Sequence, residues 1–224
     1  MPLRLAAWNV RGFRAGARRL AGAIADEEPD VVLLQEVGKV GLRLHSFARI
    51  LDMRLASGLR FWRRGVPNAV LLRPPWRIVA DSIVRLAPHR GLPLRGVTMA
   101  IAGHAGARLT AASVHLGLSD PERLVHAREI ADRLPALRQP VVLGGDLNER
   151  PHQPAAAWLR ERLWDAFEAA PDGPGETYPA SNPSARIDYL LCSEGLRVQR
   201  AWVRPDLAEL SDHLPVFADV ELEG

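Results

Sequence analysis

Short apolar runs of strand length make up most of this chain. Outside its middle they cover residues 3–10, 31–34, 141–145, 186–191, 197–203 and 216–222. In the middle, where no long helical period occurs, they cover 54–57, 68–72, 76–84, 94–102 and 109–115. Because Pro and Gly separate the middle runs, we expect consecutive strands joined by tight turns.

Four stretches are predicted to be helical, over 16–26, 42–51, 119–134 and 154–162. In the first, apolar side chains share one face at three- and four-residue spacing. The third begins with a capping-box sequence from Ser119 to Glu122, with Pro121 in its first turn. His126 lies off the apolar stripe of this helix, so we expect it to face solvent.

Two polar residues follow the apolar run at 141–145. Asp146 and Asn148 come after Gly144 and Gly145, and they are two residues apart. Residues i and i+2 of an extended segment face the same way, so both side chains can enter one pocket. The glycines allow a tight turn and the close approach of a ligand. An acid beside an amide suits a hydrated metal and a phosphate oxygen, although such residues also serve as simple turn formers.

Further polar residues stand at or beside the ends of apolar runs: Asn9, Glu36, His115, Asp188, Asp212 and His213. A carboxylate at the end of an apolar strand is costly to bury unless it is paired, binds a metal or reaches solvent. Asp188 lies within an otherwise apolar run, so it needs a buried partner. Each of these residues, taken alone, has a structural explanation.

Charge is unevenly spread, although the net charge of the 224 residues is only +3. Residues 53–110 contain ten arginines and one acid, Asp81, and therefore carry +9. Residues 111–224 contain eleven basic and nineteen acidic side chains. A basic segment favours an anionic partner, and a solvated arginine-rich surface is the alternative explanation.

The composition, with 47% hydrophobic and 25% charged residues, is that of a soluble globular protein. The single cysteine, Cys192, excludes an internal disulfide framework and is expected to be a buried strand residue. No apolar run reaches the length of a membrane span, and the N-terminus lacks a signal-peptide layout. We therefore expect one domain over 1–224, a cytoplasmic location and, by default, a monomer.

The polar motifs, taken in chain order, resemble those of a known family. They are Trp-Asn-Val, Leu-Gln-Glu-Val, Val-His-Leu, Gly-Gly-Asp-Leu-Asn, Arg-Ile-Asp-Tyr and Ser-Asp-His-Leu-Pro. The set resembles the endonuclease/exonuclease/phosphatase superfamily, which includes relatives of deoxyribonuclease I, abasic-site endonucleases, sphingomyelinases and inositol-polyphosphate 5-phosphatases. The resemblance spans residues 3–220. It implies an α/β fold of the deoxyribonuclease I kind, a four-layer αββα sandwich of two mixed sheets with the site at one edge.

The resemblance also implies roles for the matching residues. Glu36 matches the principal metal ligand, with Asn9 and Asp212 nearby, and an oxygen-only set suits Mg²⁺ or Mn²⁺. Asp188 matches the acid that orients His213. A carboxylate beside an imidazole fixes its tautomer and raises its basicity.

The other catalytic matches are His115, Asp146 and Asn148. His115 matches a second histidine that contacts the scissile phosphate or assists the leaving group. Asn148 would hold the nucleophile or a phosphate oxygen, and either His213 or Asp146 would be the general base. Phosphoester hydrolysis needs such groups because charge develops on the phosphoryl and leaving oxygens.

Three residues are weaker matches, for substrate binding. Asn68 resembles the Asn of a Gly-Asn-Ala motif of small bacterial members, although Pro67 replaces the glycine. Arg90 resembles the Arg of a Pro-Arg-Gly motif, with His89 in place of the proline. Arg123 is a further candidate, for which a solvated helix residue is the alternative.

The expected activity is divalent-metal-dependent hydrolysis of a phosphoester, and three interpretations of the chain stay open. A phosphodiesterase or nuclease acting on DNA or RNA agrees with the basic middle segment, because phosphate neutralisation dominates nucleic-acid affinity. A phosphoesterase for a small molecule or lipid head group agrees with short loops and with Trp62 beside Arg63 and Arg64. A non-catalytic module would have lost metal or proton-handling residues, and none of these positions is lost.

Overall fold

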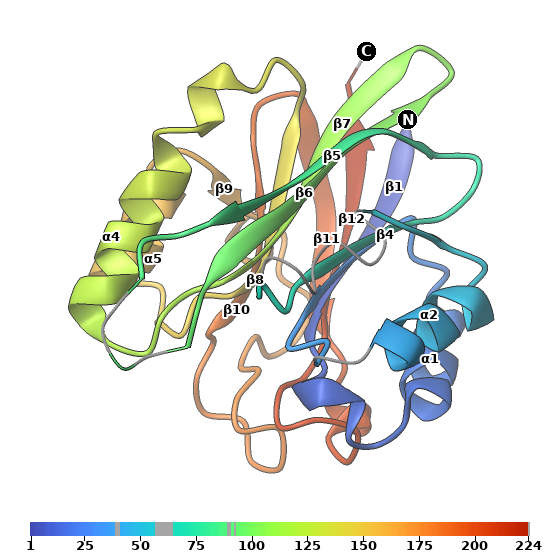
Figure 1. The fold of residues 1–224 in the computed structure, drawn as a ribbon, viewed down its shortest axis with the longest axis horizontal. Helices are drawn as coiled ribbons and strands as arrows, with labels where there is room; N and C mark the ends of the chain where they lie inside the picture. Colours follow the sequence, from blue (N-terminus) through green and yellow to red (C-terminus); the bar gives the residue numbers. More distant parts are fainter. Residues whose placement is uncertain (39–40, 57–64, 89–90, 92, 224) are drawn as a thin grey trace.

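Two mixed β-sheets pack face to face in the computed structural model, and helices cover both outer faces (Figure 1). The structure describes residues 1–38, 41–56, 65–88, 91 and 93–223. Helices α1 (Ala17–Ala25) and α2 (Gly41–Ile50) pack on one sheet, and α4 (Asp120–Ala131) and α5 (Pro154–Arg160) pack on the other. The predicted four-layer α/β sandwich is confirmed.

The first sheet has the strand order β11-β12-β1-β2-β4-β3. Its strands are β1 (Pro2–Asn9), β2 (Val31–Gln35), β3 (Arg54–Leu55), β4 (Ala69–Leu72), β11 (Leu196–Val203) and β12 (Val216–Leu222). Only β1 and β2 run parallel within this described sheet. Because parallel strands end on the same side, Asn9 lies opposite Gln35 at one rim.

The second sheet has the order β5-β6-β7-β8-β10-β9. Its strands are β5 (Arg77–Arg85), β6 (Gly96–His104), β7 (Ala107–His115), β8 (Val141–Asp146), β9 (Trp164–Asp165) and β10 (Asp188–Cys192). Strands β7 and β8 run parallel, so His115 lies opposite Asp146. Strand β10 is antiparallel to β8, which places its first residue, Asp188, opposite Asp146 as well.

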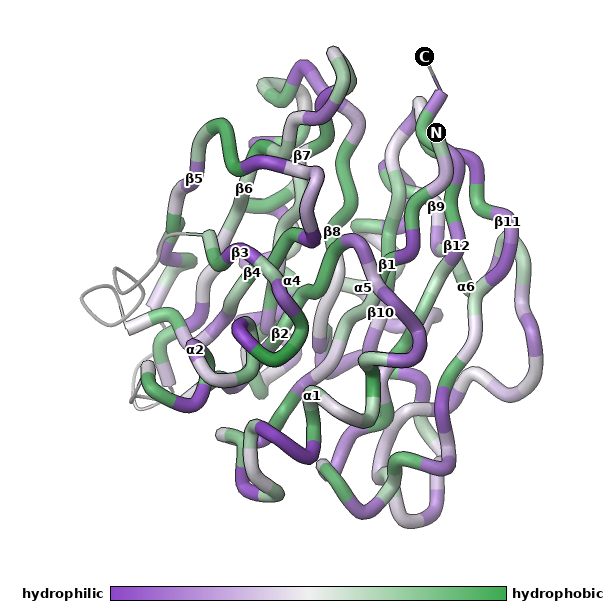
Figure 2. The backbone as a smooth tube through the Cα atoms, turned by 90° about the vertical axis from the view of Figure 1, so that its right-hand side faces the viewer, coloured by the Kyte–Doolittle hydropathy of each residue, from purple (hydrophilic) through white to green (hydrophobic). Residues whose placement is uncertain are grey.

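Apolar side chains from the inner faces of both sheets form the central core, which includes Leu5, Leu33, Val70, Ala111 and Leu190. Two further clusters lie between each sheet and its helices. In Figure 2 the two sheets overlap, the strands of each lie side by side, and hydrophobic stretches run along many strands. Because apolar cores cover both faces of each sheet, polar side chains can gather at the loops at the ends of the strands.

The four predicted helices are present, with shorter bounds at several ends. The structure adds elements that the sequence did not predict: β9, α6 (Ala166–Ala169) and short 3₁₀ helices at Arg11–Phe13, Leu134–Ala136 and Pro205–Leu207. Each is too short to show a period. Among the described helices, none is both long and apolar enough to cross a membrane.

Two local predictions about α4 are wrong. His126 is fully buried, and its Nε2 lies 2.9 Å from the carbonyl oxygen of Ala87, which belongs to the chain after β5. The capping box does not form, because Ser119 makes no capping hydrogen bond and Glu122 accepts one from the backbone N–H of Leu118. A Cβ at Gly117 would lie 2.0 Å from the Glu122 carboxylate, so that glycine makes room for the buried acid.

Candidate active site

Strands of both sheets bring polar residues to one rim of the sandwich. Strand β1 ends at Asn9, and Glu36 directly follows β2. Strands β7 and β8 end at His115 and Asp146, and Asp188 begins β10. The loop before β12 adds Asp212 and His213. The predicted metal and catalytic residues thus come from six segments that are far apart in the sequence.

One carboxylate oxygen lies at the centre of this rim. Oδ2 of Asp146 is 3.1 Å from Nδ2 of Asn9, which donates a hydrogen bond to it. The same oxygen lies 3.3 Å from Nε2 of His115 and 3.7 Å from Nε2 of His213. Asp146 is almost fully buried. A buried carboxylate within reach of an amide and two imidazoles can take part in proton transfer and in binding a cation.

His213 is fixed by a buried acid. Its Nδ1 lies 2.9 Å from Oδ2 of Asp188, and the Thr177 hydroxyl donates to the same oxygen at 2.6 Å. The indole N–H of Trp8 donates to the carbonyl oxygen of His213. Burial alone would lower the pKa of His213, but the charge and hydrogen bond of Asp188, together with Asp146, raise it to about 9. The prediction that Asp188 needs a buried partner is confirmed.

His115 has the opposite environment. Nη1 of Arg95 lies 2.9 Å from Nδ1 of His115. Because a guanidinium only donates, Nδ1 must accept, so the ring proton is on Nε2, facing Asp146. Burial, reinforced by the charge of Arg95, lowers the pKa of His115 to about 4. His115 is therefore a neutral hydrogen-bond donor near pH 7.

Arg95 is a site residue that the sequence analysis missed. Only 7% of it is exposed, and its Nε has no hydrogen-bond partner in the described part of the chain. Burial lowers its pKa. The available signal was a charged residue within the predicted strand 94–102, the same signal that singled out Asp188. Tyr178, 40% exposed with its ring 4.8 Å from that of His213, was also missed.

The three predicted metal ligands do not all face one another. Oε1 of Glu36 lies 3.3 Å from Nδ2 of Asn9 and 4.0 Å from Nδ1 of His115. The Glu36 side chain is 43% exposed, so a ligand can reach it. Oδ2 of Asp212 instead pairs with Nε of Arg11 at 3.1 Å.

A second group of possible metal ligands lies deeper in the site. Ligand atoms of Asp146, Asp188 and His213 all lie within 4.8 Å of one another. Oδ1 of Asp188 is buried without a hydrogen-bond partner among the described residues, so one acceptor is uncommitted. With Glu36 beside them, these donors are mostly oxygen atoms, which fits Mg²⁺ or Mn²⁺.

Asn148 lies at the edge of this group. Its backbone N–H donates to Oδ1 of Asp146 at 2.9 Å, and its Nδ2 donates to the Leu116 carbonyl oxygen at 3.2 Å. Its φ of 53° is left-handed, as turn-forming Asn residues tolerate. The turn that follows β8 therefore directs the amide toward the end of β7.

The weaker substrate-binding candidates differ in their placement. Asn68 is buried, and its amide donates to the carbonyl oxygens of Gly96 and Ser113. Arg123 is buried rather than solvated; its guanidinium donates to Glu149 and to the Leu118 carbonyl oxygen. Arg90 and the segment from Trp62 to Arg64 lie outside the described residues.

Comparisons with known proteins agree with this architecture. The model of the endonuclease/exonuclease/phosphatase family matches residues 6–213. No curated protein matches the chain.

Several solved structures share the fold. An endonuclease/exonuclease/phosphatase from Bacteroides vulgatus is 20% identical, with all of both chains covered and a TM-score of 0.84. A mannosyl-6-phosphatase from Bacteroides thetaiotaomicron is 17% identical, with 98% of this chain and 99% of that chain covered and a TM-score of 0.84. TDP2 of D. rerio, in complex with a single-strand DNA product, is 19% identical, with 98% and 99% covered and a TM-score of 0.79. At these identities the similarity concerns the fold alone.

Proposed function

The chain belongs to the endonuclease/exonuclease/phosphatase family, and from this premise we propose that it is a divalent-metal-dependent hydrolase of phosphoester bonds. The observation that carries the proposal is the meeting of Asn9, His115 and His213 around one oxygen of Asp146. Core packing alone would not favour this cluster, because the hydrogen bonds among buried polar and charged groups at best offset the free-energy cost of removing them from water. The non-catalytic alternative has no comparable support.

The side chains divide the chemistry between them. Asp146 is the group that can accept a proton from an attacking water near pH 7, because His213, whose ring Asp188 holds in place, keeps its own proton up to about pH 9 and accepts one only after losing it. The neutral Nε2–H of His115 and the guanidinium of Arg95 donate toward developing negative charge on a phosphoryl oxygen. Asn148 supplies an amide for the nucleophile or a second phosphate oxygen.

Glu36, with Asn9 beside it, would hold the metal ion, and Asp212 would join them only by leaving its pairing with Arg11. A bound Mg²⁺ or Mn²⁺ supplies positive charge that stabilises phosphoryl and leaving oxygens. The exposed face of the Glu36 carboxylate suits a cation that keeps several of its waters.

For the substrate we propose a phosphodiester, with DNA or RNA as the favoured source. The basic composition of residues 53–110 supports an anionic polymer, and Arg95 from this segment reaches the site. A phosphoester of a small molecule or lipid head group is the alternative. It is favoured by the shared fold with a mannosyl-6-phosphatase.

Nicking of supercoiled plasmid with and without Mg²⁺ tests this proposal. We expect metal-dependent nicking by the wild-type protein and a loss of at least about 10²-fold in His213→Ala and Asp146→Ala, because a positioned acid or base contributes about 10²–10⁴-fold. His45→Ala is the matched control, since His45 is an exposed histidine on α2.

The two substrate classes give different results. Hydrolysis of bis-p-nitrophenyl phosphate without nicking would favour the small-molecule alternative. Equal activity of the His213→Ala, Asp146→Ala and wild-type proteins would overturn the assigned site.

A further inference from the structure

Part of the basic charge of residues 53–110 lies far from the candidate active site. Arg77 begins β5, and Arg108 is the second residue of β7, beside the hairpin that joins β6 to β7. Figure 1 shows both chain termini and this hairpin at the top of the molecule. Strand β7 runs nine residues from this hairpin to His115, a length of about 26 Å at 3.3 Å per residue. The proposed phosphoester chemistry therefore does not use these arginines.

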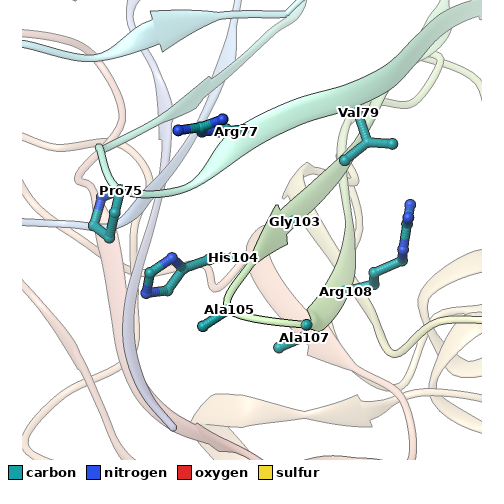
Figure 3. Close-up of a pocket in the computed structure, with 9 residues that line it drawn as sticks. Pro75, Arg77, Val79, Gly103, His104, Ala105, Ala107 and Arg108 are labelled. Atoms are coloured by element: carbon teal, nitrogen blue, oxygen red, sulfur yellow. The ribbon is translucent and has the colours of Figure 1, made fainter.

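The strand register puts the two arginines on one face with a glycine between them. Gly103 of β6 pairs with Arg77 on one side and with Arg108 on the other. Directly opposed residues of antiparallel strands point to the same face, and each pair of Cα atoms is about 5 Å apart. The side chains therefore flank a notch across about 10 Å of sheet, in which the Val79 side chain covers Gly103: a Cβ at Gly103 would lie 2.8 Å from Cγ2 of Val79 (Figure 3).

The notch belongs to a cavity of about 490 Å³. Its walls include Pro75, Val79 and His104, and none of the described residues that line it is acidic. The His104 ring is held edge-on against buried Trp76, with centroids 5.6 Å apart. A volume of this size matches a small ligand.

Neither guanidinium is engaged by a described residue. Arg77 and Arg108 are both exposed and have no hydrogen bond or ion pair in the portion of the chain that the structure describes. Arg4 and Arg204, by contrast, are held by carboxylates. Two unpaired guanidinium groups on either side of a notch repel each other and attract anions.

We propose that the Arg77–Gly103–Arg108 notch is a binding site for a ligand with two or more linked phosphate groups. Each guanidinium can bind one phosphate by paired, charge-assisted hydrogen bonds. The missing side chain of Gly103 leaves room for that of Val79, whose apolar surface lies beside the phosphates. The apolar walls at Pro75 and Val79 accommodate an uncharged part of the ligand, such as a nucleoside.

Titration calorimetry of the metal-free protein with inorganic tripolyphosphate tests this proposal. We expect saturable one-to-one binding that weakens at least tenfold in Arg77→Gln/Arg108→Gln. The matched control is Arg18→Gln/Arg19→Gln, which removes the same charge from two exposed arginines of α1 and should leave the affinity unchanged. Tripolyphosphate should also shift the backbone amide resonance of Gly103.

The outcomes separate this site from the proposed active site. Asp146→Asn should bind tripolyphosphate as the wild type does, even if the chain proves not to hydrolyse phosphoesters. If a nucleoside triphosphate binds more tightly than tripolyphosphate, the ligand is a nucleotide. If the two bind equally well, the site recognises the polyphosphate alone. Failure of the wild type to bind, or equal weakening in the two double variants, would overturn the proposal.

Discussion

Two histidines approach the same oxygen of Asp146, yet their surroundings shift their pKa values in opposite directions. His213 faces Asp188 and keeps its proton up to about pH 9, whereas burial and Arg95 lower the pKa of His115 to about 4. Between these values one ring is cationic and the other neutral. Pairs of titratable groups whose pKa values are pushed apart are a common arrangement for acid–base work.

Replacing Asp188 by Asn should remove most of the upward shift in the pKa of His213. Burial, which lowers the pKa of an imidazole, would remain, while the largest of the charges that raise it would be gone, leaving those of Asp146 and Asp212. We expect the pKa to fall from about 9 by about two units or more, which corresponds to about 3 kcal/mol. Histidine ring resonances followed by NMR in metal-free protein measure this directly.

The same change predicts the pH dependence of stability. A pKa raised in the folded state stabilises the protein below the unfolded value of about 6.5, and this stabilisation is lost as the pH rises through about 9. The advantage of wild type over Asp188→Asn in free energy of unfolding should therefore shrink between pH 6.5 and 9. An unchanged His213 pKa would contradict the assigned pair, and the exposed His152 provides a reference signal that should not move.

For single residues, the sequence was informative where a charged side chain lies inside an apolar run. Asp188 was recognisable because a carboxylate inside an apolar run needs a partner, and His213 is that partner. Arg95 is likewise a charged residue within an apolar run. Its place at the site could be inferred only by knowing that β6 begins at the rim where β7 ends. His126 was misplaced because the segment that buries it comes from another part of the chain.

At the scale of elements, Glu149 ties the turn after β8 to two helices. Its side chain is completely buried and accepts hydrogen bonds from the Arg123 guanidinium of α4 and from the first backbone N–H groups of α5, at Ala155 and Ala156. A carboxylate at a helix N-terminus also interacts favourably with the helix dipole. This contact connects the layer of helices to the segment that carries Asp146 and Asn148.

Glu149→Gln should destabilise the protein by about 3 kcal/mol, because breaking a buried ion pair leaves Arg123 buried without its main counter-charge. Glu161→Gln is the control, since Glu161 forms an exposed pair with Arg162 and should cost at most about 1 kcal/mol. Urea unfolding followed by circular dichroism gives both values. Similar losses in the two variants would show that burial of Glu149 does not matter.

The parallel pair β7–β8 depends on a glycine. Gly145 has φ of 150°, and a Cβ there would lie 1.9 Å from the carbonyl oxygen of Val114 on β7. Gly145→Ala should therefore push the strands apart and destabilise the protein by about 2 kcal/mol or more. Gly22→Ala provides the opposite case, because Gly22 lies exposed within α1 with nothing near its Cβ position.

Gly22→Ala should stabilise the protein by about 0.5–1 kcal/mol, the difference in helix propensity. Thermal unfolding of both variants measures the contrast. If Gly145→Ala were as stable as the wild type, β7 and β8 would have to move apart without any loss in free energy of unfolding.

The sequence could predict elements better than their arrangement. Periodicity and turn residues located the four longer helices and most strands, but strand pairing depends on contacts between distant segments. Only the family resemblance indicated that the ends of β1, β2, β7 and β8 would meet at one rim. Two-residue β9 and four-residue α6 are stabilised by their neighbours and carry no period of their own.

At the scale of the whole molecule, the two sheets depend on each other for a shared core. Cys192 is a probe of that core, because it lies on β10 among the residues between the sheets and is fully buried. Burial, with a smaller effect of Asp165, raises the pKa of its thiol to about 12. Since only the thiolate reacts, alkylation requires exposure of the residue.

We expect Cys192 to react with iodoacetamide at pH 8 at least on the order of 10³-fold more slowly in the folded than in the unfolded protein, given ordinary domain stability. Labelling pulses analysed by mass spectrometry across a urea series should give the same free energy as circular dichroism. Gly145→Ala should accelerate labelling by the factor that its loss of stability predicts. Labelling at a clearly lower free energy would instead mean that β10 and its edge neighbour β9 open locally while the rest of the sandwich stays closed.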